Sequence, residues 1–141
     1  MTADIEHEAA FVRAFIIATK QERLRELLAT PKRRRDVLRT LYHFRDLDPR
    51  FMIKVPPAEQ TAGGIEALLR ARGAPELCYA ISTDENLDGR TVTLRDAITR
   101  LIGVVGHGTL LSCVPGHLGY FEGEESGARY VLERKGGSTR R

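Results

Sequence analysis

The amino-acid sequence predicts an α+β fold, in which an N-terminal αα-hairpin and a short helix pack with a small mixed sheet of four strands. Hydrophobic residues recur at helical spacing through the first third of the chain. Short apolar runs bounded by Gly, Pro and Asp follow in the second half and are typical of strands. The chain has 141 residues, of which 42% are hydrophobic and 29% charged, so it is long enough to bury a core without disulfides. The expected element order is ααα-βα-βββ.

Two helices are predicted in the N-terminal part. The first covers about residues 5–28, and its apolar positions are Ile5, Ala9, Val12, Ile16, Leu24, Leu27 and Leu28. Thr30 and Pro31 suit the cap and first position of a second helix over about 31–44, which a short link makes antiparallel to the first. Residues 11–18 are apolar on more than one face, so either the domain surrounds them or a second chain covers part of them.

The remainder of the chain predicts a short helix and a sheet. Residues 45–58 show no clear period and read as an ordered connector. A short helix around Ile65 ends at Gly73, a residue suited to a left-handed C-cap. Apolar runs predict strands at 77–81, 109–114, 118–121 and 128–134, and an apolar stripe predicts a helix over 94–105. If strands 77–81 and 109–114 share a sheet, this βαβ-like unit is expected to be parallel and right-handed.

These elements predict one domain over residues 1–134, with a helical lobe over about 1–56, a sheet lobe over about 57–134 and a disordered basic tail over 135–141. Residues 1–56 carry 12 Lys and Arg against 8 Asp and Glu, whereas residues 57–134 carry 7 against 11. The net charge of +3 therefore conceals a basic front half and an acidic rear half.

Several classes of protein receive no support from the sequence. The N-terminus lacks a basic stretch followed by an apolar one, and no apolar run is long enough to span a bilayer, so we expect a cytoplasmic protein without a membrane partner. Cys78 and Cys113 lie in apolar runs and are expected to be buried free thiols. Paired His and Cys ligands at metal-binding spacing are missing, and Gly103, Gly106 and Gly108 follow a helix rather than opening one. The prediction therefore includes no metal and no cofactor.

The strongest local signal is a run of basic residues at the start of the second helix. Lys32, Arg33, Arg34 and Arg35 are consecutive, and Arg39 follows one turn later. A helix N-terminus already favours anions through its dipole, so four cations there are unfavourable unless an anion or nearby carboxylates offset them. The sequence thus nominates four anion- or nucleic-acid-binding residues: Lys32, Arg33, Arg35 and Arg39. The alternative is a solvated face paired with Glu22, Glu26 and Asp36.

A second group of candidates comes from loops and turns. His107 lies between two glycines and is a candidate general base, with a surface histidine as the alternative. His117 lies in the next turn and could line a cleft. The segment 45–50 alternates opposite charges, which suits either internal ion pairs or a polar surface at the join of the lobes. The pocket candidates are Arg45, Asp48, Arg50, His107 and His117.

Three functional hypotheses follow, in descending order. The first is a non-enzymatic binding or regulatory module that engages an unknown protein partner or a second copy of itself. The second is a protein that binds nucleic acid or another polyanion through the basic second helix. The third is a small enzyme with a histidine-containing cleft.

Overall fold

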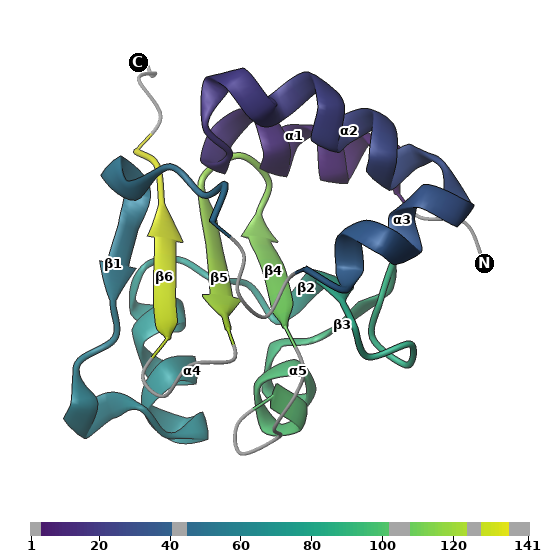
Figure 1. Ribbon diagram of the computed structural model, residues 1–141. Coiled ribbons are helices and arrows are strands. Elements are labelled where there is room, and N and C mark those ends of the chain that lie inside the picture. Colours follow the sequence, from purple (N-terminus) through teal and green to yellow (C-terminus); the bar gives the residue numbers. More distant parts are fainter. Residues whose placement is uncertain (1–3, 41–44, 102–107, 124–127, 136–141) are drawn as a thin grey trace.

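The computed structural model describes residues 4–40, 45–101, 108–123 and 128–135, which form an antiparallel sheet with helices on both faces (Figure 1). The sheet has six strands in the order β1-β6-β5-β4-β2-β3. Their bounds are Met52–Lys54 (β1), Leu77–Ser82 (β2), Thr91–Thr93 (β3), Thr109–Val114 (β4), Leu118–Glu122 (β5) and Arg129–Glu133 (β6). The α+β class is confirmed, but the prediction of four strands is wrong. It missed β1 and β3, because strands of three residues are too short to show an alternating pattern.

The predicted parallel unit is also wrong, because β2 pairs with both β3 and β4 in antiparallel fashion. After β2 the chain turns back into β3, so the next helix follows β3 and not β2 as predicted. Since β3 and β4 each run opposite to β2, they are parallel to each other and lie on either side of it. A strand–helix–strand crossover therefore exists, but its first strand is β3. β1, from the connector, pairs with β6, so strands from both predicted lobes belong to one sheet.

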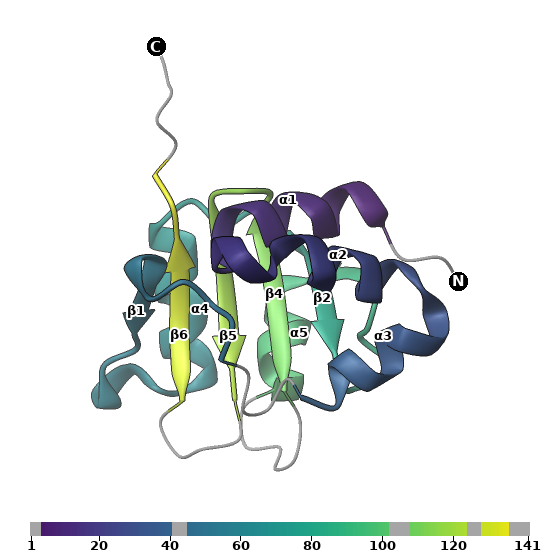
Figure 2. The ribbon, with the colours of Figure 1, turned by 45° about the horizontal axis from the view of Figure 1, so that its top comes forward.

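One face of the sheet is covered by three helices: α1 (Ile5–Phe15), α2 (Gln21–Ala29) and α3 (Pro31–Leu38). Figure 2 shows α1 and α2 crossing β4 and β2, with α3 beyond β2. The predicted single helix over 5–28 is interrupted, because the backbone after α1 bonds to the connector. The amide of Asp48 donates to the carbonyl of Phe15 (2.7 Å), and the amide of Ile17 donates to that of Asp46 (2.9 Å). A turn of 3₁₀ helix, Ala18–Lys20, then leads into α2.

The apolar excess of the first helix packs inside the chain itself. Phe11, Val12, Phe15 and Ile16 are all at most 2% exposed and form a core with the sheet, α2 and α3. Ile17 is partly exposed. Intrachain packing therefore accounts for the pattern that had suggested cover by a second chain.

The other face of the sheet packs on α4 (Ala62–Ala71) and α5 (Leu94–Leu101) through a second core. α4 ends as predicted at Gly73, whose φ of +105° is a conformation that glycine adopts without strain. Thr93 caps α5, because its hydroxyl accepts from the amide of Asp96 (3.2 Å). Within the described ranges, no helix is long and apolar enough to cross a membrane. The predicted tail lies outside the described residues, apart from the exposed Lys135.

Candidate binding groove between α2 and α3

Helix geometry splits the basic run of α3 into side chains with different surroundings. Successive residues of an α-helix point about 100° apart, so four in a row cannot share one face. Arg34 is buried at 8% exposure, whereas Lys32, Arg33 and Arg35 are exposed. Pro31 begins the helix as predicted, and the Thr30 hydroxyl donates to the carbonyl of Glu26 (3.1 Å) rather than capping α3.

Arg34 holds α3 against the rest of the domain through two carboxylates. Its Nε and Nη2 donate to the two carboxylate oxygens of Asp88, at 2.9 and 2.8 Å. Its Nη1 donates to Oε1 of Glu8 (2.7 Å), and Nη2 lies 2.7 Å from Oε2 of the same residue. Glu8 comes from α1 and Asp88 from the segment between β2 and β3, so one guanidinium ties three parts of the fold together. Such two-point forks are the strongest form of charge-assisted hydrogen bond.

The network around Arg34 extends into the sheet. The Tyr79 hydroxyl donates to Oε2 of Glu8 (2.5 Å), and the amide of Ser82 donates to Oδ1 of Asp88 (3.0 Å). Burial opposes the charge on Arg34, but hydrogen bonds to Asp88 and Glu8 outweigh it and raise the pKa of Arg34. Burial, together with the bond to Glu8, raises the pKa of Tyr79. Arg34 is therefore a fixed structural cation, and the exposed cations of α3 are the ones available to a partner.

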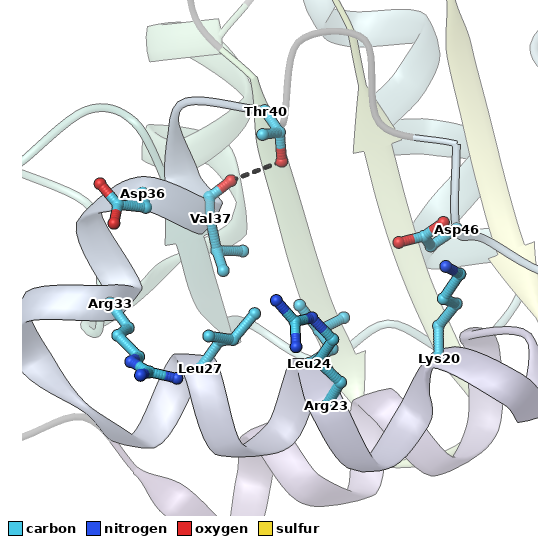
Figure 3. Close-up of a pocket in the computed structure, with 9 residues that line it drawn as sticks. All are labelled: Lys20, Arg23, Leu24, Leu27, Arg33, Asp36, Val37, Thr40 and Asp46. Atoms are coloured by element: carbon cyan, nitrogen blue, oxygen red, sulfur yellow. Dashed lines mark hydrogen bonds between the residues drawn. The ribbon is translucent and has the colours of Figure 1, made fainter.

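A groove of about 450 Å³ lies between α2 and α3 (Figure 3). Leu24, Leu27 and Val37 form its apolar floor, and the first and last of these are buried. The remaining side chains that line this α2–α3 groove are Lys20, Arg23, Arg33, Asp36, Thr40 and Asp46.

Cations outnumber carboxylates at the rim of the α2–α3 groove. Three cations, Lys20, Arg23 and Arg33, line it together with two aspartates, Asp36 and Asp46. Figure 3 shows Lys20 extending toward Asp46, Arg33 hanging from α3 toward the floor, and Asp36 pointing away from it. A cationic rim around an aliphatic floor suits a ligand that carries both carboxylates and apolar groups.

A second hollow, of about 430 Å³, lies on the other side of α3. Arg35 and Arg39 line it from α3, and Thr83 and Glu85 line it from the segment after β2. Asp88 also lines this hollow, but its carboxylate is already engaged by Arg34. Lys32 lies on the outer face of α3, where it borders a third hollow with Arg35 and Arg39. The four nominated cations are thus distributed around α3 rather than gathered into one site.

The charged connector stabilises itself. The Asp48 carboxylate accepts from the backbone amide of Arg50 (3.0 Å) and from its guanidinium (2.7 Å). Hydrogen bonds from the Arg50 side chain lower the pKa of Asp48. The Arg50 guanidinium also lies over the ring of Phe51, 5.1 Å from its centroid, and Arg45 is exposed. The geometry matches the internal ion pairing that the alternating charges suggested.

Of the two candidate histidines, only His117 lies within the described residues, and it does not line the α2–α3 groove. His117 is exposed, and its Nδ1 lies 3.3 Å from the carbonyl oxygen of Arg134. His107 lies outside the described residues. The sequence analysis missed a third histidine, His7, whose Nε2 lies 2.7 Å from Oγ of Ser112 and whose ring stacks on Tyr79. Ser112 is only 2% exposed and faces α1 from the middle of the sheet, so this contact docks α1 onto the sheet.

No family model, curated protein or solved structure matches this chain. Among the described residues, no group of three or more His, Cys, Asp or Glu side chains is arranged to hold a metal ion. The groove between α2 and α3 is the feature whose chemistry most narrows the choice of ligand.

Proposed function

We propose that this protein is a binding module whose α2–α3 groove takes an acidic, partly apolar segment of a protein partner. The observation that carries the proposal is the meeting of three cations, Lys20, Arg23 and Arg33, around an aliphatic floor. The side chains that line the groove include both charged and aliphatic groups, so the groove offers a partner ion pairs as well as apolar contacts.

The apolar floor favours a peptide over a nucleic acid as the ligand. Phosphate backbones are bound by cations and hydrogen-bond donors, and they gain nothing from aliphatic side chains beneath those cations. An amphipathic segment instead places leucine-like side chains on the floor and its carboxylates against the rim. Charge complementarity at the rim speeds association, and burial of the apolar anchors supplies most of the affinity.

The test uses two fluorescein-labelled peptides of equal length and charge. One is amphipathic, with Leu every three or four residues among Glu, and the other has Gln in place of every Leu. Fluorescence anisotropy should show tighter binding of the amphipathic peptide. Arg33→Glu should weaken its binding by roughly tenfold, because one attractive rim charge becomes repulsive.

Arg35→Glu is the matched control, since Arg35 lies on the same helix but faces the second hollow. It should change peptide affinity by less than about twofold, because its charge lies outside the groove. Equal losses in the two variants, or equal binding of the two peptides, would show that the groove is not the binding site.

Nucleic-acid binding is the second candidate, favoured by the exposure of Lys32, Arg35 and Arg39 around α3. In that case affinity for duplex DNA or RNA falls steeply with salt, and Arg35→Glu has the larger effect. The same two variants therefore separate the candidates. Arg33→Glu should weaken binding more than Arg35→Glu if the ligand is a peptide, and less if it is a nucleic acid.

A further inference from the structure

The two cysteines occupy neighbouring positions on adjacent central strands. The register of β2 and β4 places Tyr79 opposite Ser112, so Cys78 and Cys113 are the next positions along the two antiparallel strands. Both are at most 4% exposed, and both belong to the core beneath α4 and α5. They are free thiols in this structure.

The hydrogen bonds of β2 identify the kind of site that Cys78 occupies. The amide of Ala80 donates to the carbonyl of Arg90, and its carbonyl accepts from the amide of Gly89, both on the β3 side. The amide of Thr83 donates to the carbonyl of Gly108, on the β4 side. Because backbone groups of successive residues alternate between the two neighbours, Cys78 bonds toward β3, as Ala80 does. In the pairing of β2 with β4, Cys78 therefore occupies a non-hydrogen-bonded site.

Side chains approach each other most closely at non-hydrogen-bonded sites. The Cα atoms of such a pair are about 4.5 Å apart, within the range of about 4.4–6.8 Å that a disulfide spans. Ser82 and Thr109 occupy an equivalent site further along, and their hydroxyl oxygens are 2.7 Å apart. The register of β4 shifts between Ser112 and Val114 in its pairing with β5, which lies on the side of β4 away from β2.

We propose that Cys78 and Cys113 form a redox pair, which a small-molecule disulfide converts to an intramolecular cross-link between β2 and β4. One cysteine thiolate attacks the oxidant, giving a mixed disulfide and releasing one small thiol. The second cysteine thiolate then attacks the mixed disulfide, forming the Cys78–Cys113 bond and releasing the second small thiol. Two electrons pass from the cysteines to the oxidant, and the protons of the two cysteine thiols end on the two released thiols.

The surroundings of the pair determine when the exchange is fast. Burial raises the pKa of Cys78 to about 12. Burial, with a smaller contribution from Cys78, raises the pKa of Cys113. Only the thiolate attacks a disulfide, so exchange on the folded protein is slow and proceeds mainly while the chain folds or opens. A reducing compartment keeps the pair as thiols, and folding under oxidising conditions joins them.

The test is refolding of the full chain in a redox buffer. Reduced protein is unfolded in urea, diluted into oxidised and reduced glutathione at pH 8.5, and then quenched with N-ethylmaleimide in concentrated urea, so that any remaining thiol is exposed to the reagent. Intact mass should show a monomer that has lost two hydrogens and carries no maleimide. Because the cross-link closes a loop of about 35 residues, its Tm should exceed that of the reduced protein by roughly 10 °C.

Cys78→Ala is the control, because its remaining thiol should be alkylated and its Tm should not respond to the redox buffer. The proposal is overturned if the refolded wild-type chain has native circular dichroism but carries two maleimide or glutathione adducts. Cross-linked dimers as the main product would overturn it as well.

Discussion

Replacement of Arg34 by Met should destabilise the fold more than any other single change in the basic run. The guanidinium side chain is 10% exposed and sits between Glu8 and Asp88, whose side chains are 5% and 17% exposed. Met fills similar volume but leaves two carboxylates without their cation. Removing one partner of a buried ion pair costs about 3–5 kcal/mol of unfolding free energy. Glu8 keeps its bond from Tyr79, so we expect about 3 kcal/mol, or a fall in Tm of roughly 10 °C.

Urea unfolding followed by circular dichroism at 222 nm measures this loss, since the chain has no Trp. Arg33→Met is the matched control, because Arg33 is the exposed neighbour of Arg34 and its replacement should change stability by less than about 0.5 kcal/mol. Arg34→Lys keeps the charge but loses the fork, and should cost about 1–2 kcal/mol.

A double-mutant cycle between Arg34→Met and Glu8→Gln tests whether the two side chains act together. The loss in the double variant should be smaller than the sum of the single losses, with a coupling of at least about 1 kcal/mol. The reasoning is refuted if Arg34→Met and Arg33→Met unfold at the same urea concentration, because the buried network would then contribute no net stability.

Three further predictions concern buried groups elsewhere. Burial lowers the pKa of His7 from its ordinary 6.5, so the folded protein favours the neutral imidazole and its stability should fall as pH drops below about 6.5. When the urea midpoint is plotted against pH, His7→Gln should flatten the curve in that range. Burial raises the pKa of Glu122 from 4.5, so stability should fall as pH rises above that value, and an unchanged pH profile in Glu122→Gln would contradict this. A Cβ on Gly119 would lie 2.5 Å from the carbonyl oxygen of Leu111, so Gly119→Ala should lose about 1–3 kcal/mol in thermal or urea unfolding. Gly63→Ala, in open space on α4, should instead gain about 0.5–1 kcal/mol.

Local sequence patterns predicted the elements that local chemistry determines. The start of α3 at Pro31 and the left-handed cap at Gly73 follow from the residues themselves. The break after α1 does not, because it depends on backbone bonds from Phe15 and Ile17 to a connector some thirty residues away. β1 and β3 were missed for a related reason: each has three residues and becomes a strand only by pairing with a neighbour.

The candidate site was only partly predictable for similar reasons. The basic run drew attention to α3 and nominated Lys32, Arg33, Arg35 and Arg39, but it did not show which hollow each side chain lines. Arg34 differs from Arg33 and Arg35 only through partners 26 and 54 residues away along the chain. Lys20 and Arg23 join the groove because α2 packs beside α3, a contact that charge counting does not reveal.

The most direct test of the binding proposal is a methyl NMR titration of the full chain with the amphipathic Glu/Leu peptide. The α2–α3 groove predicts that the largest shift changes fall on Leu24, Leu27 and Val37. Arg33→Glu should move these changes to roughly tenfold higher peptide concentration, and Arg35→Glu should leave the titration unchanged. Changes confined to Leu38, which lines the second hollow, or no saturable change at all, would contradict the account.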